Sequence, residues 1–271
     1  MKDITILIPL TEPSTNMSET QIGYMNNCMT NIAECRNYYD GNLFVKFIFP
    51  EKDSPYDSTV NDEPEYLHNP GEKDYCSQIN FGVQHVTTEY FAIMEMDDKF
   101  NPKWFKMFND YLDTHEDVGI FLPINVVHNV KNDYREFLND IVWASSFSEE
   151  IGYIDYECLN ATASFNLTGG IFKTCEWLGY KPSIKIAFNY EYLLRATNPK
   201  SESHSPVKVY VIPKEGYYHD IFRTGSLIEQ YDKELTDDDI KLWFELAKRE
   251  HFYDKDRNKD IICTRKKEEL K

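Results

Sequence analysis

The chain has 271 residues, 41% of them hydrophobic and 28% charged, so it can bury a sizeable core and is not intrinsically disordered. Its formal net charge of −17 argues against general binding to nucleic-acid backbones, which requires a clustered positive surface, but leaves room for a local basic groove. No apolar run is long enough to span a membrane, and no signal peptide is recognisable. We therefore expect a cytoplasmic protein.

The six cysteines form no CxxC pair and have no histidine cluster beside them. This usage favours free thiols in a reducing compartment over a zinc knuckle or a disulfide scaffold. Lys and Asn far outnumber Arg and Ala, as AT-rich codons produce, so we expect a low-GC bacterium or one of its viruses as the source.

The first half of the chain alternates between two apolar patterns. Continuous apolar runs are typical of strands buried on both faces of a parallel sheet, and spaced apolar positions are typical of helices. Strands are expected over residues 4–10, 43–49, 90–94 and 118–123, and helices over 18–39, 74–87 and about 107–112. This alternation predicts a doubly wound α/β fold with a mostly parallel sheet.

The second half is less regular. A Gly-Gly turn at 169–170 precedes the next expected elements. These are helices over 172–178, 189–196 and about 237–250, and a strand over 207–212. The last helix is amphipathic, with Thr236 as its N-cap, and most simply packs on the main domain.

Three carboxylates, Glu95, Asp97 and Asp98, directly follow the third expected strand. They repel one another at the carboxyl end of a strand, where a parallel sheet opens its ligand crevice. A divalent cation bound with nucleotide phosphates would relieve this repulsion. Alternation along an extended segment would point Glu95 and Asp97 the same way. The alternative is that these acids only cap the following helix.

Residues 74–105 resemble the GT-A glycosyltransferases, most nearly those of family 2. Asn80-Phe81-Gly82 is similar to the family's Asn-x-Gly helix, and Glu95-Met96-Asp97-Asp98 is similar to its Asp-x-Asp-Asp motif, with Glu in the first place. The resemblance implies a Rossmann-like GT-A fold, with a mostly parallel twisted sheet flanked by helices. We expect a nucleotide-sugar half at 1–125, an acceptor half of the same domain at 126–228, and a C-terminal helical extension at 229–271.

The resemblance also implies a donor site and a metal site. The residues expected to contact a nucleotide-diphosphate sugar are Pro9, Leu10, Thr11, Glu51 or Asp53, Asn80, Glu95 and Met96. Asp97 is expected to bind Mn²⁺ or Mg²⁺ against the diphosphate, helped by Glu95 or Asp98 and by His219. Arg223 is a second candidate for binding phosphate, because a guanidinium fits phosphate oxygens as a fork.

The acceptor side departs from the family's pattern. The family places an acidic pair, one member of which is the catalytic base, before an arginine; if Arg195 is aligned, that pair reads Phe188-Asn189. An amide cannot act as a general base. Glu191, or next Asp220, is therefore the expected base of an inverting transfer. Two alternatives stay open: Glu191 only pairs with Arg195, or the enzyme retains configuration and needs no protein base.

These features predict a metal-dependent glycosyltransferase that moves a sugar to an acceptor hydroxyl. The alternative is a non-catalytic relative that binds nucleotide sugars or carbohydrate, because Asn189 is also consistent with lost catalysis. The acceptor is undefined: a polysaccharide, a glycoconjugate or a modified base of viral DNA. The net charge disfavours DNA, although four lysines on the acceptor half are candidates for a basic strip: Lys181, Lys185, Lys208 and Lys214.

Overall fold

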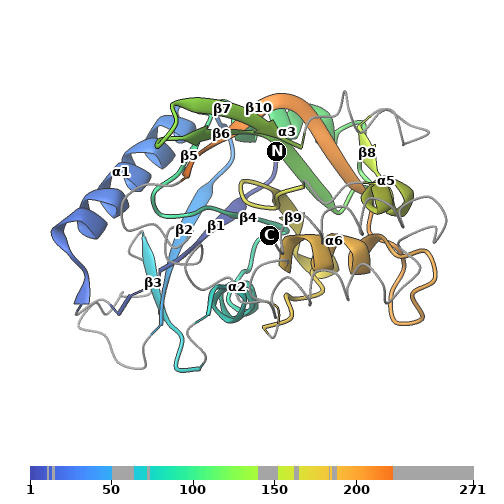
Figure 1. The fold of residues 1–271 in the computed structure, drawn as a ribbon, viewed down its shortest axis with the longest axis horizontal. Helices are drawn as coiled ribbons and strands as arrows, with labels where there is room; N and C mark the ends of the chain where they lie inside the picture. The colour runs from blue at the N-terminus through green and yellow to red at the C-terminus, as the bar shows by residue number, and fades with distance from the viewer. Residues whose placement is uncertain are drawn as a thin grey trace, which may run out of the picture.

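One sheet organises the part of the chain that the computed structural model describes. That part comprises residues 1–10, 12–13, 16–50, 64–71, 74–139, 152–161, 165–182, 184 and 188–221. Within it, ten strands are arranged in the order β3-β2-β1-β4-β9-β6-β10-β5, with β7 beside β6 and β8 beside β10 (Figure 1).

The strands are β1 (Ile4–Pro9), β2 (Leu43–Phe49), β3 (Glu65–His68), β4 (Tyr90–Ile93), β5 (Lys99–Phe100), β6 (Ile120–Asn129), β7 (Tyr134–Leu138), β8 (Tyr153–Ile154), β9 (Ile171–Lys173) and β10 (Val209–Ile221). The helices are α1 (Glu19–Arg36), α2 (Tyr75–Gln84), α3 (Trp104–Leu112), α5 (Tyr156–Ala161), α6 (Phe188–Thr197) and the 3₁₀ turn η2 (Thr174–Glu176).

Parallel pairing dominates the N-terminal part of the sheet. β1 pairs in parallel with β2 and β4, and β2 pairs in parallel with β3. Further along, β6 and β10 also pair in parallel, while β9 runs antiparallel between β4 and β6. The expected α/β class, with a central sheet of mostly parallel strands flanked by helices, is confirmed.

Helices cover both faces of this sheet (Figure 1). Apolar side chains of α1 and α3 share one core with Ile6, and those of α2, α5 and α6 share the other with Leu7. Successive residues of a strand point to opposite faces, so β1 is buried at every position and serves both cores. Its residues are therefore apolar except for Thr5, whose hydroxyl hydrogen-bonds Thr88 Oγ1 at 2.7 Å.

Some expected elements differ from those observed. The helix expected over 172–178 is wrong, because Ile171–Lys173 is the short strand β9 and Thr174–Glu176 is the turn η2. Its aromatic Phe172 pairs across the sheet with Phe91 and Ile120, so tertiary pairing decides its conformation. Strand β3 was not expected, since its sequence looks like part of a polar loop.

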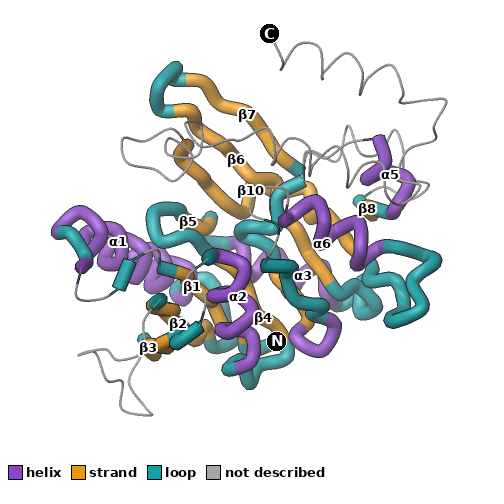
Figure 2. The backbone as a smooth tube through the Cα atoms, turned by 60° about the horizontal axis from the view of Figure 1, so that its bottom comes forward, coloured by secondary structure: helices purple, strands orange, loops and turns teal. Residues whose placement is uncertain are grey.

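β6 and β10 are longer than expected. Figure 2 shows β6 and β7 continuing beyond the rest of the sheet as an antiparallel hairpin beside β10. The expected boundary at residue 125 falls inside β6, so both halves would share one sheet. The helix near 237–250 and the extension at 229–271 lie outside the described residues. Among the helices that are described, none has the length and hydropathy to cross a bilayer.

Candidate functional site

The acidic segment after β4 forms a tight turn. The Asp98 backbone N–H donates to the Glu95 carbonyl oxygen at 3.2 Å, a contact between residues three apart that reverses the chain. The expectation that Glu95 and Asp97 would point the same way is therefore wrong, since alternation holds only along an extended segment. The turn instead directs the side chains of Glu95 and Asp98 toward the same point.

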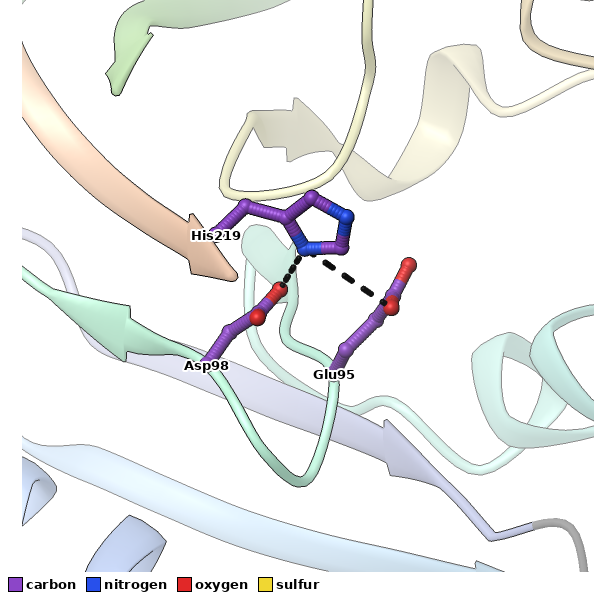
Figure 3. A group of neighbouring side chains, drawn as sticks. All are labelled: Glu95, Asp98 and His219. Carbon is purple, nitrogen blue, oxygen red and sulfur yellow. Dashed lines mark hydrogen bonds and ion pairs between the residues drawn. The ribbon is translucent and has the colours of Figure 1, made fainter. Parts of the chain in front are cut away.

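His219 completes a three-residue group with these acids (Figure 3). Its Nδ1 lies 2.6 Å from Asp98 Oδ2 and 4.0 Å from Glu95 Oε2. Potential ligand atoms of the three residues all lie within 4.8 Å of one another. The juxtaposition follows from the sheet: β5 begins directly after Asp98 and pairs antiparallel with β10, which carries His219. We call Glu95, Asp98 and His219 the acidic cluster.

Tyr217 contacts both acids of the acidic cluster, and the sequence analysis did not identify it. Its hydroxyl accepts a hydrogen bond from the Glu95 backbone N–H at 2.9 Å and also hydrogen-bonds Asp98. A Cβ on Gly169 would stand 2.5 Å from the Tyr217 ring, and Gly169 has a φ of +81°, so this close approach requires glycine. Strand alternation was the available signal, because it puts Tyr217 on the same face as His219.

The acidic cluster concentrates negative charge where Asp98 is buried and Glu95 and His219 are half-buried. Burial raises the pKa of Glu95 to about 7, an effect to which the charges of Asp98 and Asp97 add and which that of His219 opposes. Burial also raises the pKa of Asp98. For His219 burial alone would lower the pKa, but the charge and hydrogen bond of Asp98 and the charge of Glu95 raise it to about 9. The protonated imidazole is thus the cluster's own counter-charge.

The donor set fits a divalent cation. Carboxylate oxygens suit Mg²⁺ and Mn²⁺, whereas an imidazole nitrogen suits the transition metals, so the mixed set favours Mn²⁺. Binding would displace the proton of His219 and supply the positive charge that it now provides. Asp98, rather than Asp97, is the central acid of this set.

Asp97 lies beside the cluster and not within it. It lines a cavity of about 130 Å³ together with Asp98 and Asp220. The other lining residues are Tyr24, Asn27, Met96 and Lys99. Asp97 and Met96 thus flank the cluster from this cavity, and their contact with a donor stays a prediction.

The remaining donor-site expectations are described only in part. Pro9 ends β1, and Leu10 is buried, donating its N–H to Ile48 and accepting from the Gln78 amide. Asn80 exchanges two hydrogen bonds, of 2.8 and 2.7 Å, with the backbone of Tyr180, so it holds that segment in place. Its contact with a donor stays a prediction. Thr11, Glu51, Asp53 and Arg223 lie outside the described residues.

Glu191 forms ion pairs with Arg195 and Lys181. It is 4% exposed, and its carboxylate accepts two hydrogen bonds from Arg195, at 2.8 and 3.0 Å, while Lys181 lies 2.7 Å away. Burial acts to raise the pKa of Glu191, but the hydrogen bonds and charges of Arg195 and Lys181 outweigh it and hold the pKa below its usual range. The salt-bridge alternative is present in the structure. The base role stays a prediction that these contacts argue against.

Asp220, the second expected base, is exposed and lies 3.2 Å from Nδ1 of His128.

The expected basic strip is largely neutralised in the described part of the chain. Lys181 pairs with Glu191, and Lys208 pairs with Asp117, while Lys185 lies outside the described residues. Of the three strip lysines that the structure describes, two are therefore engaged in ion pairs, which weakens the case for a DNA acceptor.

A chain of neutral side chains leads from the acidic cluster to α6. Thr168 Oγ1 lies 3.5 Å from Glu95 Oε1, and the Thr168 backbone N–H donates to Asn166 Oδ1 at 3.0 Å. Asn189 Nδ2 donates to the same oxygen at 3.0 Å, and the Tyr180 hydroxyl donates to Asn189 Oδ1 at 3.2 Å. We call Thr168, Asn166, Asn189 and Tyr180 the amide network. The sequence did not indicate that these four residues lie together.

The amide network requires an amide at position 189. A backbone N–H can only donate, so the Asn166 atom facing Thr168 is an oxygen. The atom of Asn189 facing that oxygen must then be a donor, which a carboxylate lacks.

Known proteins resemble this chain in sequence pattern and in fold. The family model of glycosyl transferase family 2 matches residues 57–168. The structure of S. aureus TarS 1-349 superposes with a TM-score of 0.54 at 14% identity, covering 80% of this chain and 60% of that one. The same protein with UDP-GlcNAc gives a TM-score of 0.55 at 13% identity, covering 82% of this chain and 59% of that one. Among curated proteins no match is found.

The fold is therefore that of the GT-A glycosyltransferases, and the chain resembles glycosyltransferase family 2. The chain spans about 60% of the length of the TarS structures that it matches.

The first prediction separates Asp98 from Asp97 as metal ligand. Asp98→Asn should lower Mn²⁺ affinity by roughly 10- to 100-fold or more, because it removes a charged oxygen ligand. Asp97→Asn, the matched control, should lower it much less, through lost charge alone. Calorimetric titration of Mn²⁺ into each folded variant checks this, and the reverse ranking would restore Asp97 as the main ligand.

The second prediction concerns Glu191. Glu191→Gln should reduce the free energy of unfolding at pH 7 by about 2–3 kcal/mol, because Arg195 and Lys181 lose their buried partner. Since the pKa of Glu191 is lowered by folding, its stabilisation is present above the unfolded-state pKa of about 4.3 and is lost as the pH falls through the folded-state value. The difference between variant and wild type in denaturant melts should shrink accordingly at acidic pH.

Asp110→Asn is the control for Glu191→Gln, because Asp110 also pairs with a lysine four residues away, but on an exposed helix surface. Its effect should stay below about 0.5 kcal/mol. Equal effects of the two substitutions would contradict a structural role for Glu191.

The third prediction tests the orientation of the amide network. Asn189→Asp should destabilise the protein by about 1–3 kcal/mol at pH 7, because it sets a carboxylate oxygen against Asn166 Oδ1. Asn129→Asp is the control, since Asn129 Oδ1 only accepts, from the N–H groups of Lys131 and Asn132. Thermal unfolding checks both, and a stable Asn189→Asp protein would show that the network tolerates a carboxylate.

Proposed function

We propose that this protein is a metal-dependent glycosyltransferase that moves a sugar from a nucleotide-diphosphate sugar to an acceptor hydroxyl. The observation that carries the proposal is the acidic cluster of Glu95, Asp98 and His219 at the carboxyl end of β4 in a GT-A fold. Ligands of open α/β sheets bind at this edge. The match of residues 57–168 to the family model includes both acids.

Glu95, Asp98 and His219 would hold the cation, which when bound acts as a Lewis acid and offsets charge on the leaving diphosphate. Tyr217 fixes the backbone at Glu95 and hydrogen-bonds Asp98, so the two acids keep their spacing. Thr168, whose hydroxyl lies 3.5 Å from Glu95 Oε1, links this acid to the amide network.

A uridine nucleotide sugar is the first donor to test. The TarS structures include complexes with UDP and with UDP-GlcNAc, and they share this fold at 12% and 13% identity. The donor of this chain, its acceptor and its cytoplasmic location stay predictions.

An inverting transfer would require a protein base, for which Glu191 and Asp220 were the expected candidates. The ion pairs of Glu191 and the contact of Asp220 with His128 weaken both. The non-catalytic alternative predicts donor binding without donor cleavage, so one experiment distinguishes it.

The fourth prediction is that, with Mn²⁺ present, a nucleotide-diphosphate sugar raises the melting temperature and is slowly hydrolysed to nucleoside diphosphate. The reason is that the cation lowers the repulsion between the acidic cluster and the diphosphate. A thermal-shift screen of donors followed by chromatography of the nucleotide products checks both parts. Asp98→Asn should lose both signals. Binding without hydrolysis, with or without added alcohols and sugars, would favour the non-catalytic alternative.

A further inference from the structure

The position of the short strand β5 decides the geometry of the acidic cluster. β5 begins directly after Asp98 and pairs antiparallel with β10, with Lys99 opposite Tyr218. One step further along the same two segments, Asp98 comes opposite His219, where Oδ2 and Nδ1 lie 2.6 Å apart. A shift of β5 would therefore carry a carboxylate of the cluster away from the imidazole.

The side chain of Asn31, on α1, holds the outer edge of β5. A strand of two residues makes few ladder bonds, and β10 is its one strand partner in the described part of the chain. Asn31 Nδ2 donates to the Phe100 carbonyl oxygen at 3.0 Å, and Asn31 Oδ1 accepts from the Phe100 N–H at 2.9 Å. In an antiparallel ladder both backbone groups of one residue point to the same side, so these two face away from β10. Asn31 thus takes the place of a neighbouring strand, and α1 lies beside β5 in both views of the fold (Figures 1 and 2).

The same face of α1 also contacts the other end of the turn formed by Glu95–Asp98. Cys28 and Asn31 are three residues apart, so they share a helix face, and both are buried. The Cys28 thiol lies 3.4 Å from Sδ of Met94, directly before the turn. α1 therefore contacts the chain on both sides of the turn, at Met94 and at Phe100.

Position 31 requires an amide. A backbone N–H only donates and a carbonyl oxygen only accepts, so the side chain facing Phe100 has to supply one acceptor and one donor. A carboxylate supplies no donor, and an apolar side chain supplies neither. Asn31 is 5% exposed, so water does not readily replace these bonds. Asparagine is a poor residue for the interior of a helix, and its contact with β5 accounts for its presence there.

We propose that Asn31 is a positioning residue of the metal site, an inference that rests on the proposed function because it concerns the cation held there. Asn31 acts through the backbone of Phe100, which keeps Asp98 in reach of Glu95 and His219. Metal sites tolerate errors of only about 0.2 Å in ligand distances. Without the amide, the buried N–H and carbonyl groups of Phe100 would turn toward other partners, and β5 would carry Asp98 with it.

The test is calorimetric titration of Mn²⁺ alone into the full chain. Asn31→Leu keeps the branched shape of the side chain but removes both hydrogen bonds. It should weaken Mn²⁺ binding roughly 10-fold, the low end of what residues that orient metal ligands contribute. Ile32→Ala is the matched control, because Ile32 is the next residue of α1 and is 0% exposed in the core. It should lower the melting temperature and leave Mn²⁺ affinity unchanged.

Asn31→Asp is the second variant, and it decides the test if Asn31→Leu does not fold. Its carboxylate still accepts from the Phe100 N–H but sets an oxygen against the Phe100 carbonyl. The added negative charge alone would strengthen cation binding, so weaker binding by this variant has to come from displaced ligands. Electron paramagnetic resonance gives a readout that stability does not move. The zero-field splitting of bound Mn²⁺ should change in the Asn31 variants and stay the same in Ile32→Ala.

An affinity equal to that of the wild type in a folded Asn31 variant, or a weaker one with unaltered splitting, would overturn the inference. Either result would leave the proposed function standing, because the wild-type chain would still bind the cation. A wild-type chain that binds no Mn²⁺ would instead overturn the metal dependence of the proposed function and this inference with it.

Discussion

The structure around the site depends on burying the carboxylate of Asp98, beside the half-buried Glu95, just after β4. Removing a carboxylate from water costs several kcal/mol unless charge and hydrogen bonds compensate it. For Asp98 the compensation comes from His219, 121 residues later in the sequence, and from the hydroxyl of Tyr217. The same hydroxyl fixes the backbone at Glu95. The acidic turn and β10 therefore hold each other in place.

This requirement explains the unusual course of the second half of the chain. β10 must pair with β5, immediately after the acidic turn, and also run in parallel with β6. The space between β4 and β6 is then filled by β9, which enters antiparallel after the Gly169 turn. The Gly169 N–H donates to the Ile93 carbonyl oxygen at 2.8 Å. Thr168 is thereby brought beside Glu95, where the amide network begins.

Sequence reasoning succeeded where burial alone decides the conformation. Leu43–Phe49 was expected and is observed with the same bounds, because a strand that serves both cores is mostly apolar. Its one charged residue, Lys46, pairs with Glu65. Sequence reasoning failed for Ile171–Lys173, since so short a segment with two apolar residues fits a helix or a strand equally well and only distant partners decide between them.

Part of the site could also be predicted from the sequence, and part depends on distant partners. The acidic segment and His219 could be identified from the sequence through the family resemblance, and they do lie together. Choosing Asp97 over Asp98 assumed an extended backbone, whereas the contact between Asp98 and Glu95 forms a turn. The amide network could not be predicted, because its members come from three separate segments and carry no charge. Asn189 stood out only as a departure from the family's acidic pair, with nothing to indicate its partners. The hydrogen bonds of the network depend on which atoms face one another, and only the folded structure determines that.

The two sides of the site differ in charge, and this difference supplies an orientation for a substrate. On the cluster side, Glu95 and Asp98 repel a diphosphate until a cation intervenes, so that end of the donor is bound only together with metal. On the α6 side, Asn166 and Asn189 are neutral, and their amide groups hydrogen-bond to one another and to Thr168 and Tyr180. A carboxylate at position 189 would extend the negative charge of the cluster across both sides and remove that contrast. On the proposed function, the cation and the phosphates would lie at the acidic cluster, and the neutral amide at position 189 keeps the negative charge of the site confined to that end.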